Sequence, residues 1–450
     1  MARQFSNDMT TGSITRHLIA FALPLMIGNV FQLLYNTVDS VVVGNFVGKD
    51  ALAAVGTVGP IINTIIGFFG GIASGATVVI SQYFGAHDEE DIARAVHTTI
   101  ALCLICCVLF TGIGVALVPA MLRLMKTPDD VWNAATQYLT IYFGGVTGLI
   151  LYNIGSGILR AVGDSRRPLY FLIFCALLNT VLDLVFVLVF HMAADGVAYA
   201  TVISQLVSAV LVMLTLMRSE GPYKLYLRRI RLDVGLTKKI VGIGFPTAIQ
   251  QSVTSFSNVI VQSYINFFGS ACMAGWTCYA KLDQFIVLPV MSIGMANTTF
   301  AGQNMGAHDV DRVRQGTSTS MKLGYAASFL LLVPVFIFAP QASMFFNQDP
   351  EVVEYGVLFI RWMTPFFLIT VVNQILAGTM RGVGDATGPT IIMMASFIAF
   401  RQVYLFAVSH IHNTILLIAL GYPLGWLLCS VILTVYYRRG IWLKHAVKVV

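Results

Sequence analysis

Charged residues are scarce in this sequence. Only 11% of its 450 residues are Asp, Glu, Lys or Arg, whereas 57% are hydrophobic, and the mean hydropathy is +0.79. A soluble domain carries about 25% charged residues, and no soluble core could bury this much apolar surface. The composition therefore excludes a soluble protein and predicts that lipid is the solvent for much of the chain.

The motifs of nucleotide-driven proteins and of hydrolytic enzymes are also absent. The sequence holds no GxxxxGK[ST] loop, no HExxH pair and no GxSxG turn. Its seven cysteines lie in or beside apolar segments and lack the paired spacing typical of zinc sites or disulfides. We therefore expect neither a cofactor nor enzyme activity, and any transport would draw on an ion gradient.

Long apolar runs recur along the whole chain and predict membrane-spanning helices, because about 20 apolar residues cross the hydrocarbon core. Unbroken runs of this length exclude the short alternating strands of a barrel. The fold class predicted is an all-α polytopic membrane protein. We place its twelve spans at residues 16–44, 52–83, 92–118, 131–158, 166–190, 196–217, 237–266, 273–301, 316–339, 353–378, 388–410 and 413–436.

The distribution of Lys and Arg predicts the orientation. Twenty-one of the 27 lie in segments on one side of the predicted spans, and only Lys49, Arg123 and Lys126 lie on the other. Cytoplasmic loops carry such an excess, so both termini should be cytoplasmic, in a bacterial or archaeal inner membrane. The same bias explains the net charge of +6 without a nucleic acid partner. The basic connection near 218–236 predicts contact with anionic membrane lipid.

The sequence repeats itself at a spacing of 221 residues. QYFGAHD at 82–88 returns as QNMGAHD at 303–309, and LRAVGD at 159–164 returns as MRGVGD at 380–385. We therefore predict an N-terminal six-helix half (1–218), a cytoplasmic linker (219–236) and a C-terminal six-helix half (237–450). Six spans per copy predict a pseudo-two-fold axis along the membrane normal and a central cavity, as in many transporters. Because this symmetry lies within one chain, we expect a monomer.

The repeated loops predict helix ends. Gly85 and Gly306 should supply a left-handed residue after a helix, and Asp88 and Asp309 should cap the next helix. Arg160 and Arg381 should bond the last carbonyls of their helices or pair with the aspartates of the GD motifs.

Polar residues inside the first-half spans are the leading site candidates, since an ionisable residue in a span is costly. Gln32, Asn36 and Asp39 share one helix face, and Pro24 gives the same helix a place to bend. Pro246 corresponds to Pro24 at a spacing of 222. The arginines of the first-half spans lie only at the span ends, so none is inside the membrane to pair with Asp39.

A second polar pair lies in the fifth span, where Asn179 and Asp183 are one helical turn apart. Thr201 and Asn153 add further oxygens from the neighbouring spans. Carboxylate and amide oxygens suit Na⁺, and a confined carboxyl also suits a proton. The residues therefore predict a cation site but leave H⁺ and Na⁺ open.

The second half carries charges of both signs inside its spans, at Lys281, Asp283, Arg361 and Arg401. One interpretation is a structural network of ion pairs. The other is a role for Asp283, Arg361 and Arg401 in substrate or proton movement. The sequence favours neither.

Taken together, the twelve spans, LPLMIGNVFQLLYNTVDSVVVG in the first span, the paired GAHD loops and the paired RxVGD segments resemble the multidrug and toxic compound extrusion (MATE) family. The DinF-like prokaryotic branch is the more similar. The resemblance implies that Asp39, Asn179, Asp183 and Thr201 bind the coupling ion, with Gln32, Tyr138 and Asn153 beside them and a bend at Pro24. NorM-like members carry acidic residues where this chain has Thr254 and Thr370, so a C-terminal cation site is not expected.

The sequence therefore predicts an antiporter that exports amphipathic or cationic drugs and toxins in exchange for H⁺ or Na⁺, by rocking of the two halves. One alternative is a flippase for a lipid-linked precursor, from the same superfamily. A membrane enzyme or receptor is a third hypothesis, which the duplicated halves disfavour. A channel would fail to move its substrate uphill.

Overall fold

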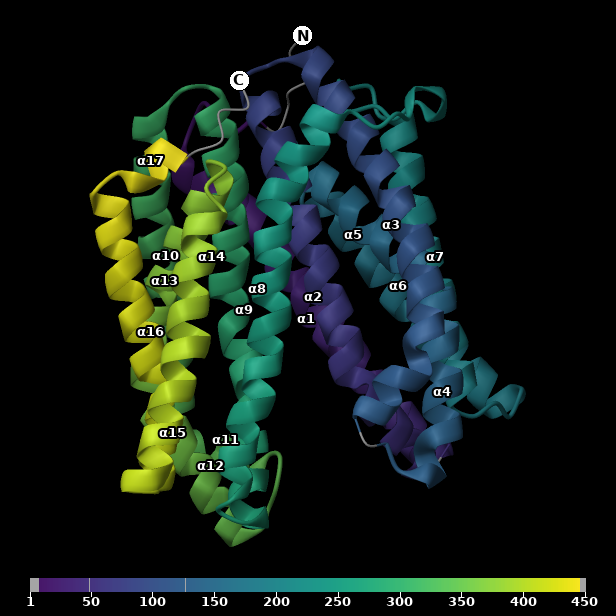
Figure 1. Cartoon of the computed structure of the whole chain (residues 1–450), viewed down its shortest axis with the longest axis vertical. Coiled ribbons are helices and arrows are strands. Elements are labelled where there is room, and N and C mark those ends of the chain that lie inside the picture. The colour runs from purple at the N-terminus through teal and green to yellow at the C-terminus, as the bar shows by residue number, and fades with distance from the viewer. Residues whose placement is uncertain (1–7, 48, 126, 446–450) are drawn as a thin grey trace. The chain divides into compact units, whose positions relative to one another are not determined.

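The computed structural model describes residues 8–47, 49–125 and 127–445, and these residues form helices joined by short loops, without a strand (Figure 1). The described helices are α1 (Ile14–Val42), η1 (Val43–Val47), α2 (Lys49–Gly85), α3 (Glu89–Leu124), α4 (Asp129–Gly144), α5 (Val146–Ala161), α6 (Arg166–Leu184), η2 (Val185–Val189), α7 (Ala194–Arg218), η3 (Leu227–Arg229), α8 (Val234–Asn266), α9 (Ser270–Gly306), α10 (Val310–Ile337), α11 (Ala339–Met344), α12 (Pro350–Met363), η4 (Thr364–Phe366), α13 (Phe367–Gly382), α14 (Thr387–Met394), η5 (Ala395–Phe400), α15 (Arg401–Ile411), α16 (Ile415–Arg438) and α17 (Ile441–His445). The predicted all-α fold class is confirmed.

Each of the twelve predicted spans is helical, although not all are equally apolar. Ten helices in the described part of the chain are long and apolar enough to cross a membrane, and α4 with α5 makes an eleventh, bent by 46° beside Gly145. The remaining predicted span, 237–266, is the seventh in chain order and lies within α8. Its 33 residues are long enough to cross, but polar side chains interrupt its apolar surface.

The chain forms two compact units whose limits differ from the predicted halves. The first unit comprises Met1–Asp8 and Ile27–Ala248, and the second comprises Met9–Met26 and Ile249–Val450. The start of α1 therefore belongs with the C-terminal helices, and the predicted linker and the start of α8 belong with the N-terminal helices. Both helices change unit two residues after a proline, Pro24 in α1 and Pro246 in α8.

Equivalent loops have equivalent geometry in the two units, which confirms the repeat at the level of the backbone. His87 and His308 have φ of 57° and 59°, and Gly163 and Gly384 have φ of 84° and 97°. The prediction that Gly85 and Gly306 are left-handed is therefore wrong. Both still lie in helices, and the sharp turn falls two residues later, where the helix can no longer continue.

Aspartates cap the helices that follow these loops. Asp88 Oδ1 accepts from the Asp91 N–H at 3.0 Å, and Asp309 Oδ1 accepts from the Arg312 N–H at 2.8 Å, as predicted. The predicted pairing of Arg160 with Asp164 is wrong within the described residues. Asp164 pairs instead with Arg167 at 3.3 Å, because the turn directs its carboxylate toward the start of α6.

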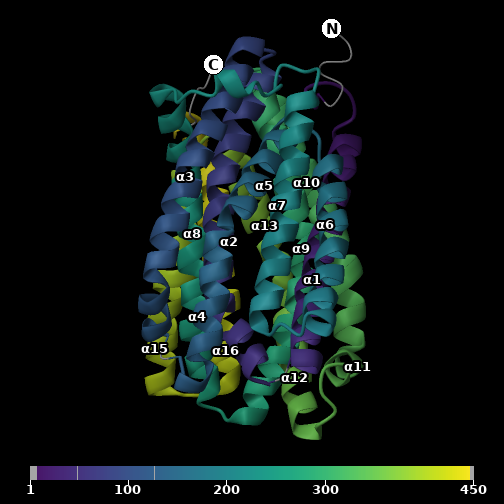
Figure 2. The same cartoon turned by 90° about the vertical axis from the view of Figure 1, so that its right-hand side faces the viewer.

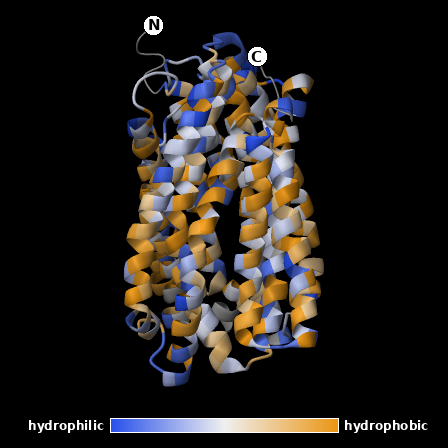
Figure 3. Ribbon diagram, turned by 90° about the vertical axis from the view of Figure 1, so that its left-hand side faces the viewer, coloured by the Kyte–Doolittle hydropathy of each residue, from blue (hydrophilic) through white to orange (hydrophobic). Residues whose placement is uncertain are grey.

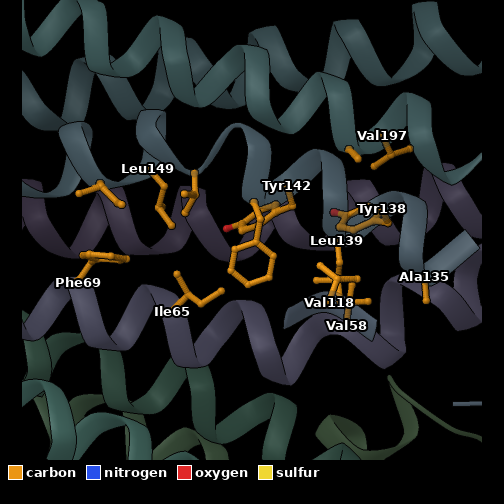
Figure 4. Packing of buried hydrophobic residues seen from close by; sticks show 14 of the residues in the cluster. Val58, Ile65, Phe69, Val118, Ala135, Tyr138, Leu139, Tyr142, Leu149 and Val197 are labelled. Atoms are coloured by element: carbon orange, nitrogen blue, oxygen red, sulfur yellow. The ribbon is translucent and has the colours of Figure 1, made fainter. Parts of the chain in front are cut away.

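The core of the first unit lies between α2, α3, α4, α5 and α7. Figures 1 and 2 show α2, α3, α6 and α7 running alongside one another. Tyr138 and Tyr142 of α4 lie among apolar side chains from the neighbouring helices (Figure 4). Labelled with them are Val58, Ile65 and Phe69 of α2, Val118 of α3, Leu149 of α5 and Val197 of α7.

In the described residues of the second unit, buried apolar side chains form separate clusters. One joins Leu18 and Phe21 at the start of α1 to α9, α10 and α13, one gathers aromatic residues of α9, α12 and α16, and one lies around Trp442. In Figure 3 the helices that face the viewer are mostly orange along their length, with blue residues near their ends. This pattern is expected for helices whose outer surface meets lipid.

Candidate functional site

Four polar side chains from three helices of the first unit meet inside its core. Asp39 lies near the end of α1, Asn179 and Asp183 on α6, and Thr201 on α7. Asn179 and Asp183 are fully buried, and Thr201 and Asp39 are 4% and 8% exposed. Residues that are far apart in sequence therefore form one buried polar cluster.

Hydrogen bonds connect this cluster. With its amide oriented to satisfy both neighbours, Asn179 donates to Asp39 Oδ1 at 2.8 Å and accepts from the Thr201 N–H at 3.3 Å. The Asp183 carboxyl and the Tyr35 hydroxyl both lie close enough to Asp39 to interact with it. Two contacting carboxyls repel when both are ionised unless a proton or a cation lies between them.

The cluster also contains oxygens that the protein leaves unpartnered. Asp183 Oδ1 and Thr201 Oγ1 are buried and have no hydrogen-bond partner among the described residues. Buried polar atoms normally have partners. With the Asp39 carboxyl they form a set of oxygen donors, the ligand type that hard cations prefer. The residues present therefore fit a proton or Na⁺ as a transported ion.

Two π-helical turns lie beside the carboxyls. The π-helix η1 begins four residues after Asp39, and η2 begins two residues after Asp183. Single π turns inside longer helices often occur at functional sites, because the wider turn frees backbone groups and reorients side chains.

The other first-half candidates have different surroundings. Tyr138 is buried, and its hydroxyl lies near Thr201 and Asp39. Asn153 donates to the Leu149 carbonyl of its own helix at 2.9 Å, and Gln32 is half-buried on α1. Pro24 lies within the continuous helix α1. The side chain of Asn36 lies outside the described residues.

The charged second-half candidates do not form the ion-pair network that was one interpretation of the sequence. Among the described residues, no ion pair joins any of Lys281, Asp283, Arg361 and Arg401. Lys281 and Arg361 are exposed, while Asp283 accepts from the Tyr279 hydroxyl at 3.2 Å. The four side chains lie on α9, α12 and α15. Their opposite charges did not bring them into contact.

Sequence reasoning missed several polar groups of the first unit. Tyr35 contacts Asp39, and buried oxygens of Tyr142, Ser204 and Gln205 have no partner in the described part of the chain. Thr201, Ser204 and Gln205 are spaced i, i+3 and i+4 on α7, so they share a face. This spacing is the sequence pattern that could have identified Ser204 and Gln205 as neighbours of Thr201.

Thr254 and Thr370, the two positions at which the resemblance led us not to expect a C-terminal cation site, both use their hydroxyls in hydrogen bonds. Thr254 Oγ1 donates to the Gln250 carbonyl at 2.7 Å, and Thr370 Oγ1 donates to the Phe367 carbonyl at 2.7 Å. Among the residues described, no group of three His, Cys, Asp or Glu side chains is placed to hold a metal ion.

Comparisons with known proteins agree on one family. A family model described as MatE matches residues 24–185 and 246–406. The chain is 30% identical over 438 residues to the probable multidrug resistance protein YpnP of Bacillus subtilis, covering 97% of both chains. It is 24% identical over 446 residues to the probable multidrug resistance protein NorM of Thermotoga maritima, covering 96% of this chain and 94% of that one.

A solved structure has the same fold. It shows the outward-facing conformation of a multidrug resistance MATE family transporter, with a TM-score of 0.90 at 23% identity, and the match covers 96% of this chain and 97% of that one.

Proposed function

Because the chain belongs to the MATE family of membrane transporters, we propose that it is a secondary antiporter that exports amphipathic or cationic drugs and toxins in exchange for H⁺ or Na⁺. Relatives named as multidrug resistance proteins support the substrate class. The halves would rock to move the substrate, as predicted from the repeat.

The observation that carries the coupling proposal is the buried contact between Asp39 and Asp183. A proton or Na⁺ binds there with Asn179 and Thr201 completing the set of oxygens. Ion binding changes the charge of the cluster, and so it favours one conformation of the transporter over another. A coupling ion must bind the two conformations with different affinity, or it drives nothing.

The test is uphill movement of a fluorescent organic cation, the ethyl ester of rhodamine B, in proteoliposomes under a proton gradient or a Na⁺ gradient alone. Asp39→Asn should reduce ion-driven accumulation by about tenfold or more, since coupling free energies are about 1–3 kcal/mol. Asp311→Asn is the matched control, because the Asp311 side chain is 85% exposed and lies in the first turn of α10, outside the proposed site.

Thr201→Val distinguishes the two ions. The substitution removes one oxygen ligand and keeps the shape, so it should weaken Na⁺-driven export and leave H⁺-driven export within about twofold. Failure of both gradients to move the dye, with wild-type protein that is correctly folded and inserted, would reject the antiporter. Transport of a lipid-linked precursor would then be the next assay, because it tests the flippase alternative.

A further inference from the structure

Arg401 is a buried cation without a carboxylate partner. It is the first residue of α15, and it is 4% exposed. Its Nη2 donates to Ser257 Oγ at 2.7 Å and to Asn258 Oδ1 at 3.0 Å, both neutral oxygens of α8. Its Nε is buried with no partner in the part of the chain that the structure describes. A charge inside a spanning helix is costly and marks a functional site when no counter-ion accompanies it.

Anchoring α15 to α8 does not explain this arginine. The neighbouring Gln402 Nε2 donates to the Ser257 hydroxyl at 2.9 Å, so a neutral residue already joins the two helices at this point. Burying a charge costs desolvation free energy that a neutral residue in the same place would not incur, which leaves the charge itself to be explained.

An aromatic surface lies against the guanidinium. Arg401 Cζ is 4.5 Å from the centroid of the Tyr422 ring, and Tyr422 lies beside Trp276 at 5.5 Å. The ring face attracts the cation, but it supplies no hydrogen-bond acceptor for Nε. The guanidinium of Arg401 therefore lacks an anionic oxygen as a partner among the described residues.

A polar face of α8 connects Arg401 to the surface of its unit. Gln251, Ser255 and Asn258 are exposed and spaced i, i+4 and i+7, so they share one helix face. Polar side chains on a spanning helix avoid hydrocarbon and line water-filled space. Asn258 belongs to this face and also bonds Arg401, so the guanidinium lies one hydrogen bond from an exposed polar surface.

We propose that Arg401, with Asn258 and Tyr422, binds the anionic group, such as a carboxylate, of zwitterionic or anionic amphipathic substrates. A guanidinium matches the planar oxygens of a carboxylate and forms charge-assisted hydrogen bonds with it. The proposal rests on the proposed export function and extends its substrate class beyond organic cations. It assigns the second unit a site of opposite charge to the cation site of the first.

The test uses two dyes that share one ring system. Rhodamine B has a free carboxylate, and its ethyl ester does not. Binding of each is measured by fluorescence with purified full-length protein in detergent, and transport of each in proteoliposomes. Arg401→Gln should weaken binding of rhodamine B by about tenfold or more, as expected for a charge-assisted bond, and leave the ester within about twofold. Arg314→Gln, an exposed arginine of α10, is the control and should change neither.

The outcomes separate this proposal from the proposed function. Equal weakening of both dyes by Arg401→Gln, or unchanged binding of rhodamine B, overturns the anion site, whatever the vesicles show. A wild type that binds both dyes in detergent but moves neither under an ion gradient contradicts the export function instead. If Arg401→Gln fails to fold, Arg401→Lys keeps the charge but loses the planar fork, and it should still weaken rhodamine B more than the ester.

Discussion

At the spacing that relates the two halves, 222 residues in the first span and 221 in the later ones, the residues of the proposed cation site have very different counterparts. Asp39 corresponds to Val261, Asn179 to Phe400, Asp183 to Tyr404, Thr201 to Tyr422 and Tyr138 to Phe359. Val261 and Phe359 are buried in the aromatic cluster of the second unit, with Tyr404 and Tyr422 packed against it. The same region of the repeat therefore contains a polar cluster with two carboxylates in the first unit and an aromatic, largely apolar cluster in the second.

The charge next to this aromatic cluster has the opposite sign. Arg401 follows Phe400, the counterpart of Asn179, and bonds Ser257, the counterpart of Tyr35. Tyr35 lies beside Asp39 in the first unit. Tyr35 of α1 and Ser257 of α8, which correspond in the repeat, thus contact a carboxylate in one unit and a guanidinium in the other. The duplicated helices therefore place a buried charged residue next to corresponding positions in the two units. The sign of the charge differs because the local side chains differ.

The largest expected contrast comes from the same position in the two repeats. Asp183→Asn should reduce ion-driven export by about tenfold or more, because it removes a carboxylate whose coupling is worth about 1–3 kcal/mol. Tyr404→Phe loses only the hydroxyl bond to the Leu417 carbonyl at 3.0 Å. Such a neutral bond contributes about 1 kcal/mol, so export should stay within twofold or so. Equal losses in proteoliposome transport would show that both halves take part in coupling.

Packing glycines provide a second contrast. A Cβ at Gly378 would lie 2.7 Å from the Gly294 carbonyl, whereas a Cβ at Gly157 meets the Thr77 hydroxyl at 3.0 Å and the Ala73 carbonyl at 3.2 Å. Gly378→Ala should destabilise the protein by about 1–3 kcal/mol through overpacking, and Gly157→Ala by less. Thermal unfolding in detergent measures the difference. The helix propensity gained is the same in both, so the reverse order would contradict this packing argument.

The smallest expected effect concerns the segments that precede α1 and α8. Asp233 accepts from the Leu236 N–H at 3.0 Å and from Arg94 Nη2 at 2.8 Å. The backbone N–H of Leu236, followed by Arg94, lowers the pKa of Asp233. The segment before α1 is held instead by Arg312, which donates to the carbonyls of Met9 and Gly12, and carbonyls do not titrate.

The pKa of Asp233 is lower in the folded protein than in the unfolded chain. Its contribution to the stability of this segment is therefore complete above the unfolded pKa of about 3.9, and it disappears as the pH falls through the lower folded pKa. Protection from hydrogen exchange, taken relative to the intrinsic rate at each pH, should therefore fall in 226–233 at low pH and stay nearly constant in 9–13. Asp233→Asn should remove this pH dependence. An equal fall of protection in both segments would indicate general unfolding.

Much of the fold follows from short-range physics. Apolar run length placed all twelve predicted spans in helices, eleven of which are long and apolar enough to cross a membrane in the described part of the chain. The repeated GAHD loops correctly predicted the caps by Asp88 and Asp309. Helix periodicity also placed Asn179 and Asp183 on one face. It did not predict that Tyr35 would reach Asp39, because that contact depends on how α1 rotates within its unit.

What the sequence determined by itself is the helical, membrane-embedded class, the duplication and several of the buried polar residues, since hydrophobicity and helical period act locally. What only the tertiary structure decided is which of those residues meet. Asp39 contacts Asp183 across 144 positions of sequence, while Arg401 finds neutral oxygens and an aromatic ring instead of Asp283. Helix packing sets such contacts through the fit of side chains along whole helices, and charge alone carries no information about that fit.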